Sequence, residues 1–181
     1  MKKIMVFLGS PRGGGNTEQL ADAFITGAVR RGNDCEKFRL AAMSILPCDA
    51  CAGCWSSGAP CLHDDDFNRL IAPKLERADA LVFASPVYYY SWSTQMKLLF
   101  DRFYPYSQKP EFLNGKETAL LCAAADETEK AFAGITAAYR GCCDYLSWKD
   151  RGSVLAFQTW EIGDVRQGNW LQKAESLGER F

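Results

Sequence analysis

Short apolar runs alternate along the chain with longer segments in which apolar residues recur every third or fourth position. The runs indicate buried β-strands, and the longer segments indicate helices with one apolar face. Strands are predicted at residues 3–8, 35–40, 80–84, 118–124 and 153–157. Helices are predicted at residues 16–31, 65–75, 93–103, 127–145 and 169–180, and Pro73 should kink or split the second. This alternation predicts an α/β fold, a parallel sheet with helices on both faces.

A parallel sheet binds ligands beyond the carboxyl ends of its strands, so the loops after residues 8, 84 and 124 are the informative ones. The first loop reads Gly-Ser-Pro-Arg-Gly-Gly-Gly-Asn-Thr-Glu over residues 9–18 and leads directly into a predicted helix. Free backbone N–H groups at the start of a helix attract an anion. Side-chain donors for a phosphate are available at Ser10, Arg12, Asn16 and Thr17.

Two nucleotide-binding motifs are missing from this loop. It has neither the G-x-x-x-x-G-K-[ST] pattern of NTPases nor the G-x-G-x-x-G pattern of dinucleotide-binding turns. A terminal monophosphate therefore fits the loop better than a pyrophosphate. The alternative is a glycine-rich turn in which Asn16 or Thr17 only caps the helix, but a cap requires neither Arg12 nor three glycines.

Composition narrows the class of protein. The chain has 181 residues, of which 48% are hydrophobic, which is enough for one domain (1–181) with a sizeable core. Its 21 basic and 22 acidic residues give a net charge of −1, which argues against a nucleic-acid partner. The longest apolar run, residues 119–125, is too short to span a membrane, so no membrane partner is expected. The apolar residues 4–8 are interpreted as a strand and not as an export signal, which predicts a cytoplasmic protein.

Four of the eight cysteines lie within a short stretch of the chain. Their pattern is Cys48-x-x-Cys51-x-x-Cys54, followed by Cys61 after six further residues. In a reducing compartment such a group is typical of metal-binding or redox-active thiols. The spacing can hold a [4Fe–4S] cluster, and the two alternatives are a zinc site with four cysteine ligands and metal-free thiols.

The other cysteines and the polar residues beside the group have simpler interpretations. His63 is interpreted as a solvated loop residue, and Asp65 or Asp66 as the cap of the following helix. The scattered cysteines are expected to pack as small apolar groups in the core, and they are Cys35, Cys122, Cys142 and Cys143.

The loops after the first and third predicted strands together resemble those of one known family. Gly9-Ser10-Pro11-Arg12 with Asn16-Thr17 is similar to the phosphate loop of the NAD(P)H-dependent FMN reductases of flavodoxin-like fold, and Ser85-Pro86-Val87-Tyr88-Tyr89 to their second flavin loop. The resemblance implies a three-layer sandwich with a five-stranded parallel sheet in the order 2-1-3-4-5. It also implies FMN as cofactor and NAD(P)H as electron donor. The cysteine group resembles that of the iron–sulfur flavoproteins, a branch of this family.

The resemblance also implies roles for individual residues. Contacts with the FMN phosphate fall on Ser10, Arg12, Gly15, Asn16 and Thr17. Contacts with the isoalloxazine ring fall on Pro86, Val87, Tyr88 and Tyr89. The third loop departs from the family's small Gly/Ser-rich stretch and offers Ala125 and Asp126. A cluster would be bound by Cys48, Cys51, Cys54 and Cys61.

The same resemblance favours a homodimer or homotetramer with each flavin near a subunit boundary. The aromatic residues Tyr90 and Trp92 follow the second flavin loop. Because exposed aromatic groups usually mark contact sites, both are expected at a subunit interface.

Three hypotheses for function follow. The first is an FMN-dependent oxidoreductase that takes hydride from NAD(P)H and passes electrons to flavin, quinone or another small acceptor; it needs no acid or base from the protein. The second is an electron carrier that shuttles between partner proteins without using a nicotinamide. An iron–sulfur flavoprotein, which moves electrons from a ferredoxin-like protein through a 4Fe-4S cluster to FMN, is intermediate between the first two. The third is a thiol or zinc protein without flavin, because a fold alone does not fix a function.

Overall fold

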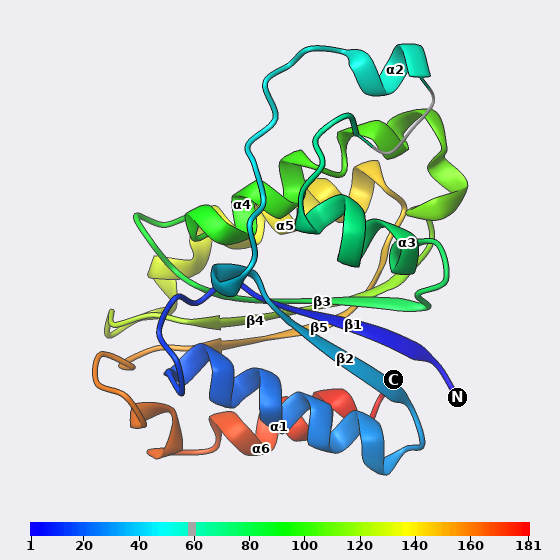
Figure 1. The fold of residues 1–181 in the computed structure, drawn as a ribbon. Helices are drawn as coiled ribbons and strands as arrows, with labels where there is room; N and C mark the ends of the chain where they lie inside the picture. Colours follow the sequence, from blue (N-terminus) through cyan, green and yellow to red (C-terminus); the bar gives the residue numbers. More distant parts are fainter. Residues whose placement is uncertain (58–60) are drawn as a thin grey trace.

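The computed structural model describes residues 1–57 and 61–181. At its centre is a five-stranded sheet in the order β2-β1-β3-β4-β5, in which all neighbouring strands are parallel. This confirms the predicted α/β architecture and strand order (Figure 1). The strands are β1 (Lys3–Leu8), β2 (Asp34–Arg39), β3 (Ala80–Pro86), β4 (Glu117–Ala123) and β5 (Lys149–Ala156).

Helices cover both faces of the sheet, as predicted (Figure 1). One face carries α1 (Asn16–Arg30) and α6 (Trp170–Gly178), and the other carries α3 (Ala72–Leu75), α4 (Thr94–Asp101) and α5 (Ala133–Tyr145). The short α2 (Gly53–Ser57) lies outside this second helical layer, in the connection between β2 and β3. Among the described residues, no helix has the length and apolar character needed to cross a membrane.

The face that carries α1 and α6 has an aliphatic core. Ile4, Val6 and Leu8 of β1 point into it, because alternate residues of a strand face opposite sides of a sheet. The two helices approach each other closely at Gly27 and Gly178. A Cβ atom on either glycine would clash with a backbone carbonyl oxygen of the facing helix, so the close packing requires glycine there.

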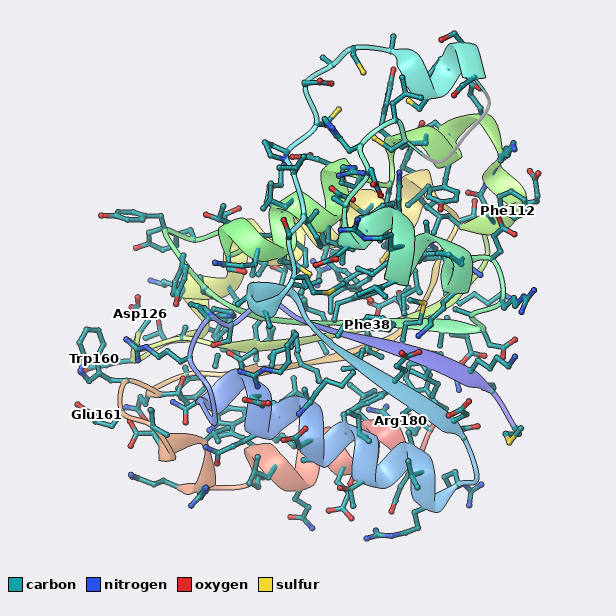
Figure 2. The ribbon with its side chains drawn as sticks, viewed as in Figure 1. Phe38, Phe112, Asp126, Trp160, Glu161 and Arg180 are labelled. Carbon is teal, nitrogen blue, oxygen red and sulfur yellow. The ribbon has the colours of Figure 1, made fainter. Side chains whose placement is uncertain are left out.

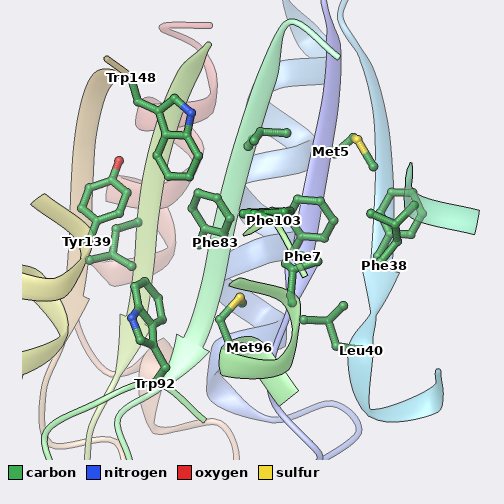
Figure 3. Close-up of a cluster of buried hydrophobic side chains, with 14 of the residues drawn as sticks. Met5, Phe7, Phe38, Leu40, Phe83, Trp92, Met96, Phe103, Tyr139 and Trp148 are labelled. Carbon is green, nitrogen blue, oxygen red and sulfur yellow. The ribbon is translucent and has the colours of Figure 1, made fainter. Parts of the chain in front are cut away.

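The opposite face has an aromatic core, shown in Figure 3. Phe83 of β3 lies at its centre, with its ring centroid 5.3 Å from that of Trp148 and 6.4 Å from that of Trp92. Trp92 is only 8% exposed, so the prediction that it lies at a subunit interface is wrong. The indole is instead part of the packing between the sheet and α4, where burial of a large aromatic group stabilises the fold.

Two predicted elements begin at other residues than expected, and a third is split as expected. The helix expected from residue 127 begins as α5 at Ala133, because Glu129–Phe132 forms a separate 3₁₀ turn. Strand β5 begins earlier, at Lys149, since its polar start lies exposed on an edge strand. The helix containing Pro73 is split as expected, into the π-turn Phe67–Ile71 and α3. Further 3₁₀ turns are Leu40–Ala42, Tyr104–Gln108, Pro110–Phe112 and Asp164–Arg166.

Candidate functional site

A cavity of about 180 Å³ opens at the carboxyl ends of β1, β3 and β4, where the fold predicts a ligand. We call it the flavin cavity, after the cofactor that the sequence resemblance implies. Of the eleven cofactor-binding residues expected from sequence, nine line it, and they are Ser10, Arg12, Gly15, Asn16, Thr17, Pro86, Val87, Tyr88 and Ala125. The other two, Tyr89 and Asp126, are exposed outside the lining. The remaining lining residues are Ala123, Ala124, Thr159, Trp160 and Ile162.

The N-terminus of α1 points unsatisfied donors at this cavity. Gly15 occupies the cap position, and its missing side chain leaves the N–H groups of the first turn without a side-chain acceptor. Thr17 is only 3% exposed, and within the described ranges its hydroxyl has no hydrogen-bond partner. The guanidinium of Arg12 is exposed and makes no ion pair with any described residue. These groups form a cradle for an anion.

The one acid in the first turn of α1 is neutralised by two bases. Glu18 accepts hydrogen bonds from Arg39 and Lys37 of β2 and from the N–H of Gly14 at 2.7 Å. These bonds, led by that from Arg39, lower the pKa of Glu18 to about 2 against the opposing effect of burial. The carboxylate therefore stays ionised without leaving a net negative charge beside the cradle.

The side-chain amide of Asn16, which was expected to contact the phosphate, makes hydrogen bonds within the protein instead. Its NH₂ group donates to the carbonyls of Thr159 and Glu161 at 3.1 and 2.8 Å. Its oxygen accepts the N–H groups of Gly163 and Val165 at 2.9 and 3.3 Å. The side chain therefore fastens the loop after β5 to the start of α1. Only the backbone N–H of Asn16 remains to serve a phosphate.

The fastened loop brings in residues that the sequence analysis missed. Trp160 and Ile162 line the flavin cavity while 67% and 61% of each residue stays exposed. Figure 2 places Trp160 at the edge where the strands end, with Asp126 above it. The only sequence signal was a pair of large apolar residues in an otherwise polar loop, and nothing local connects that loop to residues 9–18.

The loop after β3 turns sharply at the rim of the flavin cavity. Tyr88 and Ser91 pair through two backbone hydrogen bonds of 3.1 and 3.0 Å. Between them, Tyr89 and Tyr90 both have left-handed backbones, with φ of 48° and 63°. Two-residue hairpin turns of this kind favour Asn or Gly, and a bulky residue there costs about 1–2 kcal/mol. The strained turn projects Tyr89 fully into solvent, 99% exposed, and leaves Tyr88 on the cavity wall.

The four clustered cysteines lie elsewhere, on a second cavity of about 740 Å³, which we call the cysteine cavity. Residues 46–65 are here named the cysteine loop. Described residues of this loop form the roof of the cavity, and α4, α5 and the turn Tyr104–Gln108 form its floor. Cys48, Cys51, Cys54 and Cys61 all line it, and residues 58–60 between them lie outside the described part of the chain. Its lining shares no residue with that of the flavin cavity.

The thiols of this group are close enough to influence one another. Burial raises the pKa of Cys54, and the nearness of Cys61, Cys51 and Cys48 raises it further, because thiolates repel one another. The chain winds tightly between the cysteines, since Ala50 and Ala52 have left-handed backbones with φ of 57° and 55°. Such conformations are costly for alanine and cluster at binding sites.

Two neighbouring predictions have different outcomes. His63 is not a solvated residue: its side chain is 23% exposed, lines the cysteine cavity and holds Nε2 3.9 Å from an oxygen of Asp49. Asp65 does cap the next helical segment, because its Oδ1 accepts the N–H of Phe67 at 3.1 Å. Of the four cysteines expected in the core, Cys122 and Cys143 are buried, whereas the others are half-buried.

A protein-family model described as NADPH-dependent FMN reductase matches residues 2–146. The chain belongs to this family. It is 37% identical over 114 residues to an iron-sulfur flavoprotein of Archaeoglobus fulgidus, covering 63% of this chain and 50% of that one. It is 34% identical over 119 residues to one of Methanosarcina thermophila, covering 66% and 61%. The chain thus spans between half and two thirds of the length of these curated relatives.

Solved structures of low sequence identity share the fold. An NAD(P)H:quinone oxidoreductase of Methanothermobacter marburgensis superposes with a TM-score of 0.74 at 17% identity, covering 99% of this chain and 96% of that one. An azoreductase of Bacillus anthracis gives 0.70 at 16% identity, with all of both chains covered. These likenesses extend through α6, beyond the end of the family match at residue 146.

The residues of the flavin cavity suit the FMN of this family. A phosphate needs several convergent donors, and the structure leaves the Thr17 hydroxyl, the Arg12 guanidinium and the first N–H groups of α1 uncommitted within the described ranges. Gly15 suits the tight turn before α1, because a Cβ there would lie 3.3 Å from both Cβ and the carbonyl oxygen of Arg12. The donor set therefore fits a phosphomonoester.

The cysteine loop suits an iron–sulfur cluster in its donor set. Within residues 1–57 and 61–181, no three His, Cys, Asp or Glu side chains converge to hold a single metal ion. A [4Fe–4S] cluster binds each cysteine through a different iron, so its ligands need not converge on one point. Four thiols around one cavity are the ligand type and number that such a cluster requires.

Proposed function

We propose that this protein is an FMN-dependent oxidoreductase that takes hydride from NAD(P)H and passes electrons to a flavin, a quinone or another small acceptor. The observation that carries the proposal is the cradle at the start of α1, with uncommitted donors on Arg12 and Thr17. Membership in the NADPH-dependent FMN reductase family supports the choice of cofactor and donor.

In this proposal the phosphate end of FMN lies in the flavin cavity. Arg12 would supply a charge-assisted hydrogen bond, while Ser10, the Thr17 hydroxyl and the N–H groups of Asn16 and Thr17 would supply neutral ones. Ser10 is only 4% exposed, and its Oγ accepts the N–H of Arg12 at 3.2 Å, which orients both residues. The dipole of α1 adds to the attraction for the phosphate charge.

The ring system would extend across the open rim of the cavity. Pro86, Val87 and Tyr88 form one side of the rim, and Trp160 forms another. When bound, FMN supplies the hydride-accepting and electron-transferring chemistry, while the protein supplies orientation and a suitable electrostatic environment. The exposed rings of Tyr88 and Trp160 offer flat apolar surfaces for aromatic packing. Tyr89 and Asp126 stay outside the described lining, and their contact with flavin remains a prediction.

Binding and turnover test this proposal separately. The purified protein should bind FMN and oxidise NAD(P)H when an acceptor is added. Arg12→Ala should weaken FMN affinity by about 10–100-fold, because hydrogen bonds to charged groups contribute roughly 1.5–3 kcal/mol. The flavin-loaded variant should keep its turnover. Arg140→Ala, on the exposed face of α5, is the control and should leave affinity unchanged. Equal FMN affinity in Arg12→Ala and the unchanged chain would refute the phosphate assignment.

A second function is favoured by the cysteine loop. We propose that Cys48, Cys51, Cys54 and Cys61 hold a [4Fe–4S] cluster, which supplies one-electron transfer when bound. The protein would then exchange electrons with a ferredoxin-like partner as well as with small molecules. Support comes from the single cavity that all four cysteines line and from the similarity to two proteins named iron-sulfur flavoproteins.

Metal analysis tests the cluster directly. Protein purified without oxygen should contain about four irons per chain and show broad absorption beneath the flavin bands. Cys61→Ser should lose this iron, whereas Cys122→Ser, at a buried cysteine far from the loop in sequence, should retain it. Zinc in place of iron, or a metal-free yellow protein, would overturn the cluster assignment.

We also propose that the protein forms a homodimer or homotetramer. Tyr89 and Tyr90 lie beside the flavin cavity and are 99% and 60% exposed. Large exposed aromatic residues in one place usually mark a contact surface. Sedimentation of the unchanged chain and of a Tyr89→Ser/Tyr90→Ser variant tests this, and a monomer in both cases would contradict it.

A further inference from the structure

The cysteine loop lies outside the sheet, yet side chains that take no part in the thiol group hold both of its ends. The backbone of Leu46, at the first end, donates its N–H to Asp65, at the second, over 2.9 Å. The carbonyl of Leu46 accepts a hydrogen bond from Arg102 at 3.0 Å. The side chains of Asp65 and Arg102, which come from two distant segments, therefore bind the backbone N–H and carbonyl of Leu46.

The pair that makes these contacts is buried and makes several further contacts. Asp65 and Arg102 form an ion pair in which the side chains are 2% and 1% exposed. Asp65 also accepts the N–H groups of Phe67 and Asn68 at 3.1 and 3.3 Å. Burial alone would raise the pKa of Asp65, but the hydrogen bonds from Arg102, Leu46 and Asn68 outweigh it and lower the pKa. The guanidinium of Arg102 lies over the ring of Phe67, 4.9 Å from the centroid. Because Arg102 follows α4 directly, the pair fixes the loop to the body of the protein.

A third side chain reaches the far arm of the loop. The amide of Asn68 donates to the carbonyl of Cys61 at 2.8 Å and to that of His63 at 2.6 Å. Asn68 belongs to the helical segment that Asp65 caps, so the position of Cys61 is tied to the same buried pair. The near arm is held independently, by stacking of Trp55 on Tyr104 with centroids 5.6 Å apart.

We propose that Arg102, Asp65 and Asn68 are positioning residues for the thiol group, and that Asn68 sets the place of Cys61 relative to the other three cysteines. The inference deepens the proposed cluster function and rests on it only for the metal. The described contacts are made by protein groups alone, so the protein itself brings the fourth ligand to its place. None of these three residues touches the flavin cavity.

The test uses Asn68→Ala, which removes both amide hydrogen bonds and leaves the buried ion pair in place. After anaerobic reconstitution with iron and sulfide, we expect iron to pass to a chelator about fivefold faster than from the unchanged chain. An increase of this size in local opening of the loop is expected when the net contribution of one hydrogen bond is lost. In the reduced, metal-free protein, alkylation of Cys61 by iodoacetamide should accelerate by a similar factor. Alkylation of Cys48 and of buried Cys143 should not change, since a general loosening would expose Cys143 as well.

Two further variants keep the result interpretable. Asn114→Ala removes an exposed amide that makes no side-chain hydrogen bond to a described residue, and it should behave like the unchanged chain. Arg102→Lys keeps the positive charge but cannot make the paired hydrogen bonds of a guanidinium, and it should accelerate alkylation of the half-buried Cys54 and Cys61 while FMN affinity is retained. Equal alkylation of Cys61 in Asn68→Ala and Asn114→Ala would overturn the inference. If the unchanged chain takes up no iron, the cluster proposal fails, and the alkylation rates still decide the positioning.

Discussion

Most of the flavin cavity is bounded by loops that leave the ends of strands, whereas the cysteine loop stands outside the sheet and is held by a few side chains. Residues 9–17 and 86–88 leave the ends of β1 and β3, so hydrogen bonding along the sheet fixes where these loops begin. The cysteine loop depends on Asp65, Arg102 and Asn68 instead. The backbone of a site that begins at the sheet should keep its position when a single side-chain contact is lost. The backbone of a loop held by a few side chains should not.

The largest expected effect is at the buried pair that holds the cysteine loop. Arg102→Leu leaves the Asp65 carboxylate buried without its partner, which should lower the free energy of unfolding by roughly 3–5 kcal/mol. Arg69→Leu is the matched control, because Arg69 pairs with Asp64 and Asp66 at the surface and should contribute no more than about 1 kcal/mol. Urea unfolding measures both variants, and equal stabilities would contradict the distinction between buried and exposed pairs.

The next effect concerns pH and the start of α1. The pKa of Glu18 is lowered from 4.5 to about 2 in the folded protein, so its contribution is fully present above the unfolded value and is lost as pH falls from 4.5 towards 2. A shift of this size corresponds to roughly 3 kcal/mol of stability. Glu18→Gln should flatten the stability profile across this window. A profile that keeps its slope in the variant would assign the acid sensitivity to other carboxyl groups.

Two tryptophan variants test whether FMN affinity depends on the flavin cavity alone or on the cysteine loop as well. Trp160→Ala should weaken FMN affinity by about fivefold, because an aromatic contact contributes about 1 kcal/mol. Trp55→Ala removes an equally large exposed side chain from the cysteine loop and should leave FMN affinity unchanged. Titration with FMN, followed by fluorescence, measures both variants. A loss of affinity in Trp55→Ala would show that the two regions are coupled.

The smallest effect is expected at the strained turn beside the flavin cavity. Tyr89→Asn replaces an exposed side chain with one that tolerates a left-handed backbone, so stability should rise by no more than about 1 kcal/mol. Thermal unfolding measures the change. If the variant is more stable but turns over NAD(P)H more slowly, the tyrosine side chain is retained for function; a less stable variant would refute the strain.

The two regions also differ in how far the sequence predicted them. The parallel sheet and the position of the flavin cavity followed from local patterns, because a parallel sheet brings the ends of β1, β3 and β4 together, whereas the strand order followed from the resemblance to a known family. The contribution of Trp160 was missed, since its loop is fastened by Asn16, which lies 143 positions away from Thr159. Trp92 was misplaced because an aromatic residue after a strand can face the core or solvent, and only packing against Phe83 decides which.

The contacts that hold the cysteine loop were even harder to predict from the sequence. Its spacing of cysteines indicated a thiol site, but the side chains that hold it were outside the pattern. Arg102 lies 37 positions from Asp65, and no local periodicity links them. Burial of that pair and the bonds to Leu46 depend on the packing of α4, which emerges only when the whole domain is folded.

The central claim is that the flavin cavity and the cysteine loop are two separate cofactor sites in one domain. Its most direct test is the amount of FMN and iron per chain in three anaerobically purified proteins: the unchanged chain, Arg12→Ala and Cys61→Ser. We predict that Arg12→Ala, washed free of loosely held flavin, loses FMN and keeps about four irons, and that Cys61→Ser loses iron and keeps FMN. Loss of both cofactors in either variant, or of neither in both, would contradict the claim.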